Sequence, residues 1–148
     1  MTATVVTIAD ALVVELNGHQ FSQDFAAVRA YLPSYELKDM DTLHVTVVPA
    51  EYEGSPNDRT RDDERHTLHI AVQQRFKSAA NGVVALDSLD ALMALCEEIR
   101  DFLRTLVLAG CPDARRVKTE TKPIYDPKHL AELGQFTGLL AFTYRIVR

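Results

Sequence analysis

The sequence predicts an α+β fold, in which an antiparallel or mixed β-sheet packs against one long amphipathic helix, with a short N-terminal helix and a short C-terminal helix before the last strand. Three observations predict it. Residues 43–48, 66–76 and 140–147 have the two-residue period of strands. Residues 87–110 carry a broad apolar stripe at helical spacing. The strands come in blocks around this one helix instead of alternating with helices, which argues against a parallel Rossmann-type sheet.

Length and composition indicate one domain spanning residues 1–148. Hydrophobic residues make up 47% of the chain, enough for a core without a metal or disulfide. The net charge of −5 is opposite to that of most nucleic-acid binders. No uninterrupted apolar run reaches the ~20 residues of a membrane span, and the first residues lack the basic region of a signal peptide. We therefore expect a reduced protein made in the cytosol, with no membrane partner.

The first half of the chain predicts one helix and two strands. Residues 7–17 have helical apolar spacing, with Thr7 as the cap and Gly18 as a left-handed stop. Residues 25–32 and 43–48 alternate as strands do, and a proline follows each of them.

A long charged loop is expected at residues 51–65, which carry nine charged residues and join two predicted strands. A plain hairpin needs only ~2–5 loop residues. The segment has too little apolar surface to fold on its own subunit, so we expect it to be mobile until a neighbour orders it.

The second half predicts the main helix and the closing strands. The helix over residues 87–110 ends at Gly110, and residues 116–124 form a polar strand at a sheet edge. Asp126 caps a short helix that ends at Gly134, before the last strand. The predicted core places Leu92, Cys96, Ile99 and Leu103 of the helix against Leu68, Ile70, Val72, Phe142 and Tyr144 of the sheet.

Candidate catalytic residues are few, and we expect no cofactor. His44, His66 and His69 flank the charged loop, and His with Asp or Glu is a common metal-ligand set. His66 and His69, however, are three apart on a strand and should point to opposite faces. Cys96 lies on the apolar stripe and Cys111 follows the helix C-terminus, where the dipole disfavours a thiolate.

Several segments, taken in order, carry a resemblance over residues 21–148. They are Tyr31-Leu32-Pro33, the strand with its proline at residues 43–49, the amphipathic helix around residues 89–106, the turn Pro123-Ile124-Tyr125-Asp126-Pro127-Lys128-His129-Leu130, Phe136, and the strand Phe142-Thr143-Tyr144-Arg145. In this order the chain resembles the tail terminator (neck) proteins of long-tailed bacteriophages.

The resemblance implies a structural subunit, not an enzyme. It implies a hexameric ring that caps the last ring of the major tail tube protein, stops tube growth and offers the surface to which the head–tail connector or head-completion protein docks. DNA would pass through the lumen without specific recognition. The location would be the tail–neck junction of the virion, after synthesis in the host cytoplasm.

Other functions stay open at this stage. The chain could be another neck, minor tail or head-completion protein. It could be a small cytosolic metal-dependent enzyme using the region of His44, His66 and His69 with a carboxylate from the loop. It could also be a regulatory module whose acidic loop recognises a basic partner.

Self-association is expected through the edges of the sheet, at the strands over residues 116–124 and 25–32. Closure into a ring requires two different patches on each subunit. The predicted contacts to a neighbouring subunit or to the tube are Thr119 and Thr121 on the edge strand and Arg59, Arg61 and Arg65 in the charged loop.

Overall fold

The computed structural model describes residues 1–31, 41–76, 86–121 and 124–148. In order, the elements of these residues are α1 (Thr4–Gly18), β1 (Ala27–Arg29), β2 (His44–Pro56), β3 (Asp62–Arg75), α2 (Leu86–Arg104), β4 (Arg115–Glu120), α3 (Pro127–Leu133) and β5 (Gln135–Val147). None of the helices in these ranges is long and apolar enough to cross a membrane. Leu32, Pro33 and Pro123, which belong to the resemblance, lie outside the described residues.

The strands form one mixed sheet in the order β1-β2-β3-β5-β4. β1 pairs with β2 in parallel, and every other described pair is antiparallel. The α+β class is therefore confirmed. The two strands predicted as edges do occupy the two edges, although β1 and β4 are both shorter than the predicted strands.

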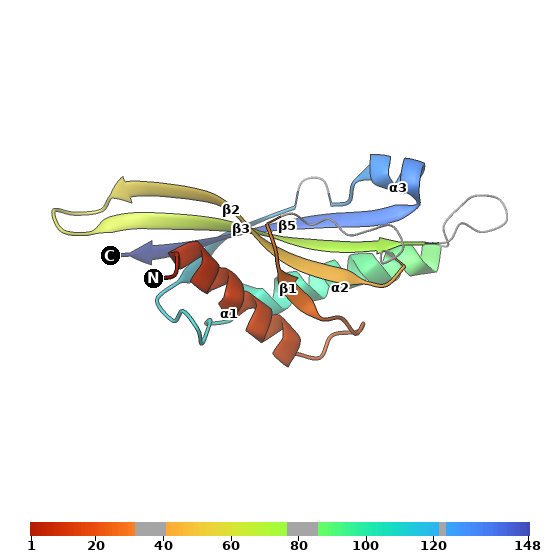
Figure 1. Cartoon of the computed structure of the whole chain (residues 1–148), viewed down its shortest axis with the longest axis horizontal. Helices are drawn as coiled ribbons and strands as arrows, with labels where there is room; N and C mark the ends of the chain where they lie inside the picture. Colours follow the sequence, from red (N-terminus) through yellow and green to blue (C-terminus); the bar gives the residue numbers. More distant parts are fainter. Residues whose placement is uncertain (32–40, 77–85, 122–123) are drawn as a thin grey trace.

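The hydrophobic core lies between the sheet and the helices α1 and α2, which cover the same face (Figure 1). The predicted core is confirmed, because Leu92, Cys96, Ile99 and Leu103 belong to one buried cluster with Leu68, Ile70, Val72, Phe142 and Tyr144. Gly138 of β5 lets α2 approach closely, since a Cβ atom there would lie only 3.3 Å from the Sγ of Cys96.

The prediction of a charged loop at residues 51–65 is wrong. The strands β2 and β3 continue through this segment and pair from Glu51–Thr67 out to Pro56–Asp62. Only the residues from 57 to 61 form the turn. The β2–β3 hairpin projects past the helices, with both chain termini near its base (Figure 1). The segment is thus ordered within its own subunit by backbone pairing, not by a neighbour.

Two local features explain why the strand does not stop at Pro49. A register shift between Pro49 and Glu51 makes a β-bulge, a position at which a proline without an N–H group is tolerated. At the tip, the Asp58 carboxylate accepts hydrogen bonds from the backbone N–H groups of Thr60 and Arg61, both at 2.9 Å. These hydrogen bonds stabilise the charged carboxylate and so lower the pKa of Asp58, and the bond from Thr60 has the largest effect.

The ends of α1 differ from the prediction. The helix begins at Thr4 with Ala3 as its N-cap, so Thr7 lies inside the helix. Its start lies one turn earlier because Val5 already packs against the core. Gly18 is not left-handed, and the C-cap, His19, is extended with φ −106°. The side-chain amide of Asn17 connects the end of α1 to β1, because it accepts a hydrogen bond from the N–H of Ala27 and donates one to the Ala27 carbonyl.

The helix α2 ends at Arg104, not at Gly110. The Nε and Nη2 atoms of Arg116 donate to the Arg104 carbonyl at 3.2 and 3.1 Å, and so satisfy a group that a helix end leaves unpaired. The chain then turns, which buries Leu108 and brings Gly110 against Ala11 of α1.

The C-terminal elements agree with the sequence. Asp126 accepts hydrogen bonds from the N–H groups of Lys128 and His129, Pro127 opens α3, and Gly134 ends it with φ 63°. The last strand is longer than predicted, because β5 begins at Gln135.

Candidate subunit interface

Each side of the sheet has a backbone edge without a strand partner in the described residues. β1 pairs with β2 only from Val45 to Val47, so the outer edge of β2 is open from Val48 to Pro56. On the other side, β4 is the last strand of the described sheet, with its outer edge open from Arg115 to Glu120. Unpaired N–H and C=O groups along such edges can bind another strand.

The two open edges lie at the same level along the strands. Two rows of cross-strand neighbours connect them: Glu53, Arg65, Arg145 and Arg115 in one row, and Glu51, Thr67, Thr143 and Lys118 in the other. Side chains alternate along a strand, so these rows lie on the face opposite to the core residues Leu68 and Ile70. The hydroxyls of Thr67 and Thr143 are 2.9 Å apart in the middle of one row.

The charges on the two edges have opposite signs. Glu51 and Glu53 make the edge of β2 acidic, and both are exposed. The edge of β4 carries the exposed cations Arg115 and Lys118 and one acid, Glu120, which lies 3.3 Å from the Nζ of Lys118, so cations predominate on this edge. Each row therefore runs from a carboxylate on one edge to a cation on the other.

In the row of Glu53, Arg65, Arg145 and Arg115, the two middle arginines share one carboxylate of the same subunit, that of Asp63. Asp63 lies 2.9 Å from the Nε of Arg145 and 3.6 Å from the Nε of Arg65. Arg115, at the end of the row, has no ion pair within the described part of the chain.

The predicted contact residues do not form one patch. Thr119 lies on β4, where its hydroxyl accepts a hydrogen bond from Arg116, and Thr121 follows the end of that strand. Arg59, Arg61 and Arg65 lie on the hairpin. Arg61 pairs with Asp58 at 2.6 Å and Arg65 with Asp63, so these two are already paired within the subunit.

The structure does not bring the three histidines together. His66 is 5% exposed and lies on the core face of β3, whereas His69 lies on the opposite face and His44 begins β2, paired with Gln73. No group of three or more potential metal ligands occurs in residues 1–31, 41–76, 86–121 and 124–148. Neither ring nitrogen of His66 has a hydrogen-bond partner among the residues that the structure describes, and burial lowers the pKa of His66.

The cysteines do not form a reactive site. Cys96 is buried beneath the sheet, and burial raises its pKa to about 11, which keeps it a thiol. Cys111 is half-buried and forms no disulfide.

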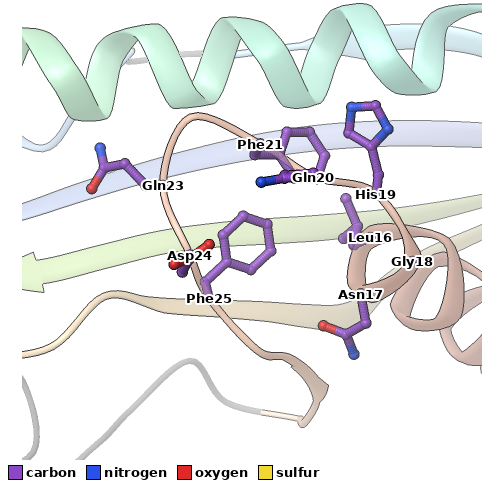
Figure 2. Close-up of a pocket in the computed structure, with 9 residues that line it drawn as sticks. All are labelled: Leu16, Asn17, Gly18, His19, Gln20, Phe21, Gln23, Asp24 and Phe25. Carbon is purple, nitrogen blue, oxygen red and sulfur yellow. The ribbon is translucent and has the colours of Figure 1, made fainter.

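The sequence does not predict a pocket of about 280 Å³ that is lined by the end of α1 and the connection leading to β1. Figure 2 shows that its lining comes from one continuous segment, with the rings of His19, Phe21 and Phe25 on it. The His19 ring stacks on Phe102 of α2 with centroids 4.1 Å apart, and Glu98 of α2 accepts hydrogen bonds from Ser22. These contacts fix the connection onto α2, which is a structural role.

In comparisons with known proteins, no protein-family model and no curated protein matches the chain.

Proposed function

We propose that this chain is a structural virion assembly protein that closes the end of a phage tail tube as a ring, ends tube elongation and forms the surface for head–tail joining. The observation that carries the proposal is the pair of open sheet edges, which differ in sequence and charge and lie on opposite sides of one subunit. Two different patches are what a head-to-tail ring requires, whereas a two-fold dimer uses one patch twice. The proposed number of six subunits and the position of the ring at the end of the tube rest on the resemblance to tail terminators.

In this function the chain acts by binding and has no catalytic step. Its partners are further copies of itself, the major tail tube protein on one ring face and the connector or head-completion protein on the other. DNA passes through the lumen without being read. The separation of His44, His66 and His69 weighs against the metal-enzyme alternative, because ligands to one ion must converge within a few ångströms.

The length of tail tubes tests the proposal. A major tail tube protein is polymerised with and without this chain, and tube lengths are measured by electron microscopy. We expect added protein to shorten the tubes and to place a ring-shaped density on one tube end. Unchanged lengths and bare ends would overturn the terminator function. Density on isolated heads and not on tubes would assign the chain to head completion instead.

A further inference from the structure

We infer that neighbouring copies in the ring join by strand addition, the open edge of β4 in one copy lying along the open edge of β2 in the next, with Lys118 facing Glu51 and Arg115 facing Glu53. The inference rests on the proposed function, because it specifies the contact that closes the ring. The partner is a second copy of this chain, and no other protein is needed.

Backbone geometry suits this contact. β2 and β4 run in opposite directions within the subunit, because three successive antiparallel pairs separate them. Rotation about an axis along the strands keeps these directions, so β4 of one copy and β2 of the next are antiparallel. The six residues of β4 match the open stretch of β2 at the same level of the sheet. The sheet would then continue from copy to copy.

The charge rows fit the same register. Cations directly opposite each other are destabilising, and the row of Arg65, Arg145 and Arg115 has an acidic neighbour, Glu53, at only one end. The Glu53 of a second copy, placed next to Arg115, gives the row a carboxylate at its other end. In the adjacent row, the Glu51 of that copy meets Lys118.

The same charges disfavour the wrong contacts. Two β2 edges would bring carboxylates together, and two β4 edges would bring cations together, which repel each other. Only the contact between unlike edges places the carboxylates of one edge against the cations of the other, and such a heterologous contact forms a ring where the rotation from copy to copy closes. Each edge also carries one exposed apolar side chain for burial, Tyr52 at 62% exposure and Val117 at 43%.

Charge reversal on each edge tests the inference. One variant carries Glu51→Lys with Glu53→Lys, and the other carries Arg115→Glu with Lys118→Glu. Each variant alone places like charges at every contact, so we expect self-association about a hundredfold weaker than that of the parent, measured by sedimentation and light scattering. A control with Asp90→Lys and Glu97→Lys on the exposed side of α2 makes the same change in net charge as the first variant and should assemble like the parent.

Mixing gives the decisive result. In an equimolar mixture of the two variants, every contact between unlike chains pairs opposite charges, so an alternating ring of even number should form. A chain carrying all four substitutions should also assemble by itself. Circular dichroism and thermal unfolding verify that each variant is folded.

The outcomes separate this inference from the proposed function. If the single-edge variants assemble like the parent, or the mixture stays monomeric, the β2–β4 contact is wrong, even where the parent still caps tubes. A parent that stays monomeric at millimolar concentration also overturns the inference. If the mixture forms rings but the parent does not change tube length, the contact stands and the terminator function fails.

Discussion

Replacing Gly138 by alanine tests how closely α2 packs on the sheet. A Cβ atom at this position would lie 3.1 Å from Cε1 of Phe136, 3.3 Å from Sγ of Cys96 and 3.4 Å from the carbonyl oxygen of Ile124. Overpacking of this kind costs about 1–3 kcal/mol, and loss of glycine's freedom in the unfolded chain returns about 0.5–1 kcal/mol. We expect Gly138→Ala to lower the free energy of unfolding by about 1–2 kcal/mol. At an unfolding entropy of about 0.3 kcal/mol/K for a chain of this length, Tm falls by about 3–6 °C.

The assay is urea and thermal unfolding followed by circular dichroism, with Gly18→Ala as the matched control. Apart from its chain neighbours and the backbone of its own helix, no heavy atom of the described residues lies within 4 Å of a Cβ added at Gly18, and its φ is outside the left-handed region. The control should therefore be as stable as the parent or more stable. In a Cys96→Ala background the cost of Gly138→Ala should shrink, because one of the three close contacts is removed. A Gly138→Ala variant that unfolds at or above the temperature of the parent would refute the close approach.

Two other predictions concern the core and the hairpin base. The side chain of Leu92 is 1% exposed, so Leu92→Ala should lower the free energy of unfolding in urea by about 3–5 kcal/mol. Leu86 on the same helix is 74% exposed, and Leu86→Ala should change that free energy by no more than about 0.5 kcal/mol. Equal losses would show that the buried face of α2 is misassigned. Because burial lowers the pKa of His66 in the folded state, the unfolded chain binds its proton more readily, and stability should fall as the pH drops below the unfolded pKa of about 6.5. Glu64 opposes this shift and Arg148 adds to it. His66→Gln should flatten the profile between about pH 5 and 7, and an unchanged profile would exclude this origin.

The fold class could be predicted from the sequence because the buried faces are regular. In β3, the buried residues Leu68, Ile70 and Val72 recur at every second position, and their spacing alone predicts a strand with one face in the core. The same method fails for the outer half of the hairpin, where every residue from Glu51 to Asp62 is exposed. A strand that buries neither face has no apolar period to detect, so the charged residues of this segment predict a loop instead.

The candidate interface was predicted in part, for a related reason. The polar composition of residues 116–124 predicts a strand at a sheet edge, and the structure confirms the edge position for β4, which spans Arg115–Glu120. The charge rows could not be predicted, because Glu53 and Arg115 become related only through the pairings of β2, β3, β5 and β4. The two bulges, near Pro49 and Val117, also shift the register in ways that spacing does not reveal.

The projecting hairpin has a consequence for local stability. Its outer residues are held by backbone hydrogen bonds between β2 and β3, but from Glu51 to Asp62 they bury little side-chain surface. Local opening there needs much less free energy than opening of the helix-covered strands, so amide hydrogen exchange should be fastest near Asp58 and slow down toward Leu68. A segment that opens so readily can adjust its twist to an adjoining strand while the core stays closed, and its amides would become protected once that strand is in place.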